Sequence, residues 1–127
     1  MAVAVQEPTT DVDFVTTAVV TNHRARVEPS VELSLAEVIE TPVEVGSTRA
    51  VMAPAANSVE VVLDAETPLF AMSEVAWQLQ SEGLVMNVLV SLDRLGEAHM
   101  ELRGTPCTLQ GWWISDDDVR FTGYEIP

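Results

Sequence analysis

The sequence predicts a single α+β domain rich in β-strands, with one main helix packed on a curved antiparallel sheet. Valine supports the strands, because 15 of its 20 copies precede residue 67 and β-branched side chains suit a pleated, half-buried surface. The segment 68–82 has helical periodicity and suitable residues at both ends. Four strand-like segments separated by turn residues follow it and predict a C-terminal meander. The alternative is an all-β barrel or sandwich in which residues 68–82 form a strand.

Length and composition favour one folded unit. The chain has 127 residues, of which 47% are apolar and 20% charged, whereas disordered chains contain fewer apolar residues. We expect a flexible arm over residues 1–10 and one globular domain over residues 11–127. The only cysteine is Cys107, which excludes an internal disulfide, so the core alone must hold the fold.

The first half of the chain is predicted to form a series of strands. Residues 12–20 alternate with a period of two and predict a first strand. Turn-forming residues at 21–24 then predict a hairpin, and residues 25–35 resume the alternation as its return strand. Pro29 has no N–H group, which places the return strand at a sheet edge or gives it a bulge.

Residues 34–41 fit either a helix or a strand. Ser34 and Glu37 have the spacing of a helix capping box and Pro42 would end such a helix, whereas the apolar β-branched residues between them suit a strand equally well. Short apolar runs predict further strands at residues 43–45, 49–52 and 59–63.

The main helix is predicted over residues 68–82. Thr67 is a favourable N-cap, Pro68 suits the first helical position, and Gly83 is a natural left-handed stop. One face carries apolar side chains at helical spacing, namely Leu69, Met72, Val75, Ala76 and Leu79. Phe70 and Trp77 widen this apolar arc, so we expect the helix to be covered on more than one side.

The C-terminal half predicts antiparallel strands. The strand-like segments cover residues 84–92, 97–103, 107–114 and 119–126. Turn residues at 94–96, 104–106 and 115–118 separate them, and connections this short join antiparallel neighbours.

The charge balance excludes several partners. Twenty acidic residues outnumber six basic ones, all of them Arg, and the net charge is −14. Nucleic acids and anionic membranes are bound by clustered cations, so neither is expected as a partner. The apolar uncharged run over residues 83–92 is about half the length of a membrane helix, and the N-terminus lacks the pattern of a secretory signal. We therefore expect a soluble protein located in the cytoplasm or in a virion.

The candidate site combines polar and aromatic side chains of the last three predicted strands. In a strand over residues 97–103, Ala98, Met100 and Leu102 face the core, while His99 and Glu101 share the opposite face. Adjacent strand residues point to opposite faces, so only one residue of the pair Trp112 and Trp113 faces a given core. Trp113 is in phase with Cys107 and is expected to be the buried one, whereas Trp112 projects outward.

Arg120 and Tyr124 have the matching phase in the last strand, and they complete a predicted binding or interface surface. Its members are Trp112, Tyr124, His99, Glu101 and Arg120. On the concave side of a curved sheet this surface would line a pocket, and on the convex side it would form a protein interface. The third alternative is that a loop or the N-terminal arm covers these residues.

No motif indicates catalysis, a metal site or a cofactor. His99 and Glu101 lack a third convergent group, because His23 lies in a predicted turn with no companion. The acidic residues 116–118 indicate a solvated hairpin tip, since they lack the ligand spacing of a calcium loop. Cys107 is predicted to be a buried, inert thiol.

Two functional hypotheses follow. The leading one is a non-catalytic structural or interaction protein that associates with copies of itself as a subunit of a larger assembly such as a virion. The alternative is a protein that binds a small apolar molecule in an aromatic-lined pocket, either as a binder or as an enzyme of the cyclase or isomerase type.

Overall fold

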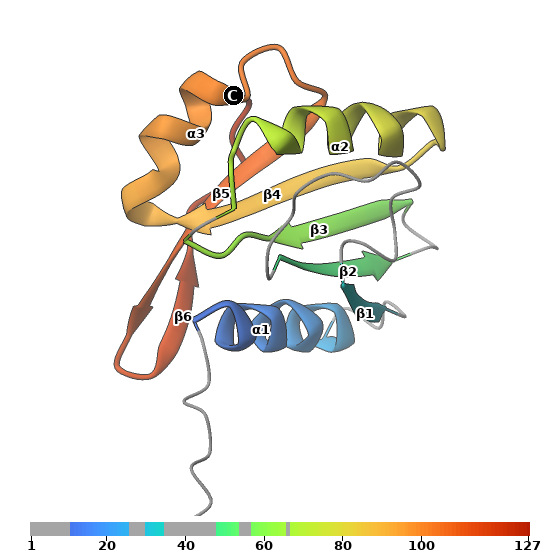
Figure 1. Ribbon diagram of the computed structural model, residues 1–127. Helices are drawn as coiled ribbons and strands as arrows, with labels where there is room; N and C mark the ends of the chain where they lie inside the picture. Colours follow the sequence, from blue (N-terminus) through green and yellow to red (C-terminus); the bar gives the residue numbers. More distant parts are fainter. Residues whose placement is uncertain (1–10, 26–29, 35–47, 54–56, 66) are drawn as a thin grey trace, which may run out of the picture.

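The computed structural model describes residues 11–25, 30–34, 48–53, 57–65 and 67–127, and these form one mixed sheet with helices on both faces (Figure 1). The elements in chain order are α1 (Asp11–Ala25), β1 (Val31–Ser34), β2 (Arg49–Ala53), β3 (Ser58–Val62), α2 (Ala71–Ser81), β4 (Val85–Ser91), the 3-10 helix η3 (Leu92–Arg94), α3 (Leu95–Glu101), β5 (Cys107–Ser115) and β6 (Asp118–Phe121). The α+β class predicted from the sequence is confirmed. No helix in the described ranges is long and apolar enough to cross a bilayer.

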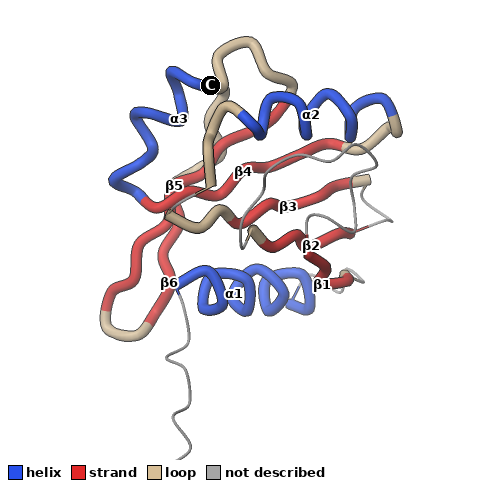
Figure 2. Tube along the Cα trace, in the orientation of Figure 1, coloured by secondary structure: helices blue, strands red, loops and turns tan. Residues whose placement is uncertain are grey.

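The described strands form one sheet in the order β1-β2-β3-β4-β5-β6 (Figure 2). Its two outer parts are antiparallel. The centre is different, because β3, β4 and β5 run parallel to one another. Parallel neighbours need a crossover connection, and α2 and the pair η3–α3 provide the two crossovers. The predicted C-terminal antiparallel meander is therefore wrong for β4 and β5.

The β5–β6 hairpin is the part of that meander that the structure confirms. Ser115 pairs with Asp118, and the two residues between them have positive φ angles, 50° at Asp116 and 63° at Asp117. Two successive positive φ angles are typical of the type I′ turn, whose twist matches that of paired strands. The acidic hairpin tip is exposed, as the sequence predicts.

The sheet curls around α1 without closing (Figure 1). Helix α1 lies on the concave face and contacts β2, β3 and β6, whereas α2 and α3 lie on the convex face against β4 and β5. The strands β1 and β6 are the two edges. The all-β barrel or sandwich offered as an alternative is thus replaced by an open half-barrel that carries helices.

Alternate side chains of the central strands enter two separate cores. On β3, Val61 packs under α2 and its neighbour Val62 packs under α1. On β4, Val88 and Leu89 divide in the same way. Because both faces are covered, the central strands carry apolar residues on both faces, as is typical of parallel strands.

Residues 11–25 form a helix, so the predicted first strand and the hairpin at 21–24 are wrong. Val12, Val15 and Val19 recur at helical spacing and are buried against the sheet. Threonine is a poor helix former, but Thr16 Oγ1 donates to the Val12 carbonyl at 2.7 Å, which satisfies this buried hydroxyl within the helix. The β-branched composition therefore does not exclude a helix here.

The remaining first-half predictions have mixed outcomes. Of the return strand over 25–35, the structure shows the strand β1, and β2 and β3 match the predicted runs 49–52 and 59–63. The other predictions, namely the arm at 1–10, the Pro29 bulge, the segment 35–41 and the run 43–45, lie outside the described residues.

The predicted helix over 68–82 is confirmed as α2, although it begins later. Its N-cap is Phe70, while the amide and the hydroxyl of Thr67 both donate to Asp64 Oδ1 at 2.6 Å. Gly83 ends the helix with φ of 78°, as expected. The amides of Gly83 and Leu84 donate to the carbonyls of Gln80 and Leu79, which is the Schellman arrangement. It is one of three α-helices among the described residues, and α1 is longer.

Residues 95–101 form α3, so the predicted strand at 97–103 and the turn at 94–96 are wrong. Ala98 and Leu102 are buried, but Met100, which the strand prediction places in the core, is exposed. An apolar pair four residues apart fits one face of a helix, and the Leu102 amide donates to the Ala98 carbonyl at 3.0 Å. Alternation over so short a segment did not distinguish the two structures.

Candidate functional site

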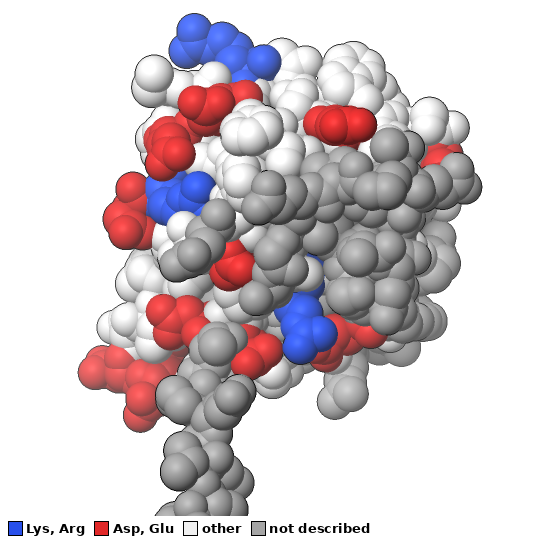
Figure 3. All heavy atoms as spheres, viewed as in Figure 1, with Lys and Arg blue, Asp and Glu red and all other residues white. Residues whose placement is uncertain are grey.

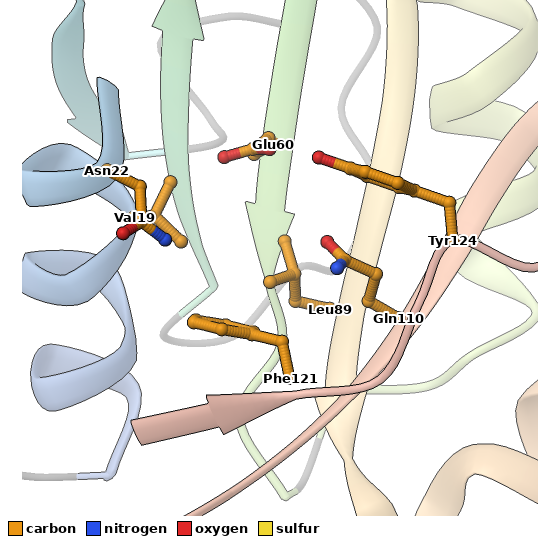
Figure 4. Close-up of a pocket in the computed structure, with 7 residues that line it drawn as sticks. All are labelled: Val19, Asn22, Glu60, Leu89, Gln110, Phe121 and Tyr124. Atoms are coloured by element: carbon orange, nitrogen blue, oxygen red, sulfur yellow. The ribbon is translucent and has the colours of Figure 1, made fainter. Parts of the chain in front are cut away.

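A pocket of about 300 Å³ opens on the concave face, between the C-terminal half of α1 and the chain that follows β6 (Figure 4). We call it the α1 pocket. The described residues that line it are Val19, Asn22, Glu60, Leu89, Gln110, Phe121 and Tyr124. They come from α1, from the three parallel strands and from the C-terminal segment, so the pocket exists only in the complete fold.

Two buried polar residues form the floor of the α1 pocket. Glu60 on β3 is 8% exposed and Gln110 on β5 is 9% exposed. Between them lies β4, whose Asn87 is also buried and is in register with Glu60. A carboxylate and two amides in the middle of a covered sheet face are costly to bury, because each loses its contacts with water. Packing alone would favour apolar residues at these positions.

A chain of hydrogen bonds crosses the sheet beneath the pocket. Thr108 Oγ1 donates to Asn87 Oδ1 at 2.8 Å, Asn87 Nδ2 donates to Gln110 Oε1 at 2.8 Å, and Gln110 Nε2 donates to the Thr122 carbonyl at 2.9 Å. A backbone carbonyl can only accept, so Gln110 must turn its NH₂ group towards Thr122. That choice fixes the orientation of Asn87 and then the direction of the Thr108 hydroxyl. We call these four residues the amide chain.

Aromatic side chains form the wall opposite α1. Figure 4 shows the Tyr124 ring reaching across the pocket with its hydroxyl end towards Glu60, and the Phe121 ring lying below. The segment that carries Tyr124 is fixed to β5 by two backbone hydrogen bonds between Leu109 and Glu125, of 2.9 and 2.8 Å. His99 Nε2 on α3 also lies 3.0 Å from Glu125 Oε1. Tyr124 is thus held in place although its side chain is largely exposed.

The structure separates the five residues predicted as a binding or interface surface. Tyr124 lines the α1 pocket. His99 lies on α3 and contacts Glu125 rather than Glu101, which is exposed, and Arg120 is an exposed residue of β6. The shared strand face of His99 and Glu101 does not exist, because these residues belong to a helix.

The two tryptophans are reversed relative to the prediction. Trp112 is 6% exposed and packs with α1 in the concave core, whereas Trp113 is 38% exposed. The prediction that Trp112 lies on the same face of the strand as Gln110 is right. The predicted exposure of that face is wrong, because α1 lies over it. Within the described part of the chain, Trp112 Nε1 is buried without a hydrogen-bond partner.

The residues of the pocket floor were not predicted from the sequence. A signal for them is present, because Glu60 is a charged residue inside the apolar run 59–63 and Asn87 is an amide inside the run 84–92. A polar residue in a strand covered on both faces must find a partner or line a site. Recognising this signal requires knowing that both faces are covered.

Other chemically active groups in the described ranges serve the fold. Burial raises the pKa of the Cys107 thiol to about 11, so at neutral pH it is a protonated and weakly reactive group, in agreement with its prediction as inert. A second hollow of about 370 Å³ at the carboxyl ends of β3 and β4 is lined partly by Asp11, Asp64 and Asp93. Asp64 anchors Thr67 there, and no group of three or more potential metal ligands occurs among the described residues.

In Figure 3, acidic side chains gather on the side that carries α3 and the β5–β6 hairpin. Comparisons with protein-family models, with curated proteins and with solved structures give no match. The chemistry of the α1 pocket therefore carries the functional argument.

Proposed function

We propose that this chain is a small-molecule-binding protein whose ligand occupies the α1 pocket. The observation that carries the proposal is the buried pair Glu60 and Gln110 at the pocket floor. This develops the second hypothesis drawn from the sequence, with a polar floor added to the expected aromatic wall.

The energetics of burial support a binding role. Burying a carboxylate and an amide in a covered sheet face costs free energy, and buried polar groups are typical of places where a ligand must be oriented. The amide chain holds Gln110 in one orientation before any ligand arrives, which reduces the entropy lost on binding. The volume of about 300 Å³ is at the lower end of the range for ligand pockets, which indicates a small ligand.

The test is a fragment screen followed by amide chemical shifts in NMR spectra. We expect some fragments to bind saturably and to shift the resonances of Gln110 and Tyr124. Asn22→Trp places a large ring at the pocket rim and should abolish this binding, because Asn22 is an exposed lining residue of α1. The matched control is Thr17→Trp, an exposed α1 position outside the lining, which should bind normally.

Two results would overturn this proposal. One is the failure of every fragment to bind saturably. The other is binding that Asn22→Trp leaves unchanged, since the ligand would then occupy some other place.

Self-association is a second proposal, and one feature favours it. Phe70 and Trp77 are 69% and 55% exposed on the outer side of α2, seven residues apart and so about 10 Å apart along one helix face. Two copies of α2 packed antiparallel about a two-fold axis would bring each Phe70 against the other copy's Trp77, which makes the face complementary to itself. Glu74 lies between the two aromatics, so association should strengthen at high salt.

Light scattering over a tenfold concentration range at two salt concentrations tests this second proposal. We expect the mass of the wild type to rise with concentration and with salt, and Trp77→Ser to remain a monomer. A wild-type protein that stays at 13.8 kDa throughout would refute it. Trp112→Ala, a natural choice if Trp112 were exposed, is unsuitable because Trp112 belongs to the core.

A further inference from the structure

We infer that the ligand of the α1 pocket is a small organic cation, a protonated amine or a guanidinium group attached to a short apolar body. This inference rests on the proposed function and names the chemical class that the pocket would select.

The charge of the pocket lining favours a cationic ligand. Glu60 is the one charged residue among the described lining residues, and it is 8% exposed at the floor. A carboxylate has two oxygens with about four acceptor positions, so it can serve protein contacts and a ligand together. Because Glu60 lines the pocket, its carboxylate attracts an opposite charge on the ligand and repels an anion.

The aromatic wall of the pocket also favours a cation. The rings of Phe121 and Tyr124 border the pocket on the side facing α1 (Figure 4). The faces of aromatic rings carry negative potential and attract cations. The rings also offer apolar surface, together with Leu89 and Val19, for the body of the ligand. A carboxylate combined with aromatic rings fits an amine that carries an apolar group.

The amide chain leaves some hydrogen-bonding groups of Gln110 available to a ligand. One N–H of Gln110 is committed to the Thr122 carbonyl, and Gln110 Oε1 accepts from Asn87 while keeping a second lone pair. This lone pair and the Glu60 carboxylate are acceptors, and an ammonium group, which has donors only, complements them.

The electrostatic field of the whole protein favours cations as well. The net charge of −14 lowers the potential around the molecule, and Figure 3 shows acidic side chains gathered along one side of it. Such a field raises the local concentration of small cations and opposes the approach of anions. The long-range field and the pocket floor therefore favour the same class of ligand.

The experiment compares three probes of similar size and different charge at neutral pH. They are 2-phenylethylamine, which is a cation, 2-phenylethanol, which is neutral, and 3-phenylpropionate, which is an anion. Dissociation constants come from NMR titration of the full chain. We expect saturable binding of the amine, weaker binding of the alcohol and no binding of the anion.

Glu60→Gln is the decisive variant because it keeps the shape of the side chain and removes its charge. Losing a charge-assisted hydrogen bond should weaken binding of the amine by about 10- to 100-fold and leave binding of the alcohol nearly unchanged. The matched control is Glu74→Gln, the same substitution at an exposed position of α2 on the opposite face of the sheet, where no effect on either probe is expected. Tyr124→Leu, at an exposed position, should weaken the amine by about 2- to 5-fold and serves as a second variant if Glu60→Gln does not fold.

The outcomes separate this inference from the proposed function. If the alcohol or the anion binds as tightly as the amine and Asn22→Trp abolishes that binding, the cation inference is wrong and the pocket remains a binding site. If the amine binds equally well to wild type and Glu60→Gln, the inference is also wrong. If none of the three probes binds, the cation class is overturned, and the fragment screen decides the proposed function separately.

Discussion

Replacing Trp112 by Ala should destabilise this protein much more than the same replacement of its neighbour Trp113. Trp112 is 6% exposed and packs in the concave core with Val12, Val15 and Val19 of α1. Trp113 points to the other side of β5 and is 38% exposed. The two substitutions remove the same atoms from adjacent positions, so they differ only in what surrounds the ring.

The size of the effect follows from the buried area. A buried aromatic side chain withdraws about 150–250 Å² from water, which at about 25 cal/mol per Å² is about 4–6 kcal/mol. Measured costs of removing a buried aromatic ring are about 3–5 kcal/mol, because the surroundings relax in part. For Trp113, which keeps more than a third of its surface in water, a typical value of about 1 kcal/mol is expected.

Urea unfolding followed by far-ultraviolet circular dichroism measures both losses without relying on tryptophan fluorescence. With a slope of about 2 kcal/mol per molar urea, Trp112→Ala should lower the unfolding midpoint by about 2 M and Trp113→Ala by about 0.5 M. A cost at Trp113 equal to or larger than that at Trp112 would refute the reasoning, because α1 would then not cover the face that Trp112 occupies.

Three further outcomes are expected. Burial raises the pKa of Cys107 from 9.0 to about 11. As the pH rises, this thiol therefore ionises first in the unfolded chain. The stabilisation from the buried, protonated thiol is complete below about pH 9 and should be lost as the pH rises towards 11. Urea midpoints taken across that range should show this loss in the wild type and not in Cys107→Ala. Gly111→Val should cost about 1–3 kcal/mol in urea unfolding, because even a Cβ atom there would lie 3.1 Å from Leu92 and 3.2 Å from Leu95, and an unchanged midpoint would contradict this packing. Asp117→Gly should raise the melting temperature by a few degrees, since Asp117 has φ of 63°, and a lower melting temperature would contradict the turn geometry.

The parts of the fold that could be predicted are those where several sequence signals agree. Helix α2 has an amphipathic face and ends at Gly83, so periodicity and the C-terminal stop support the same assignment. Strands β2 to β5 are apolar runs bounded by turn residues, and their positions were predicted correctly. The direction of β5 relative to β4 could not be predicted, because it depends on residues 95–101 being a crossover helix rather than a strand.

Helix α1 was missed for a different reason. Its valines and threonines favour strands on average, and residues 12–20 match a period of two as well as a helical period. Tertiary packing decides between them, because Val15 and Val19 fill the concave core and Thr16 is satisfied by the Val12 carbonyl. Once α1 is misassigned, the concave face appears open, and Trp112 appears exposed.

The candidate site was predicted only at Tyr124. The floor residues Glu60 and Gln110 lie 50 residues apart in sequence and come together because β3, β4 and β5 are adjacent and parallel. Since the predicted meander placed a strand over residues 97–103 between β4 and β5, that topology kept these two residues apart.

The amide chain also bears on how the sheet finds its correct alignment. Apolar residues occur on both faces of β4 and β5, so the hydrophobic effect distinguishes poorly between the native alignment and a shift by one residue. Such a shift would turn Thr108 and Gln110 onto the convex face and leave Asn87 buried without a partner, at a cost of several lost hydrogen bonds. We expect these polar side chains to favour only one alignment of the central strands. The amide chain that orients Gln110 in the pocket therefore also protects the sheet from misfolding.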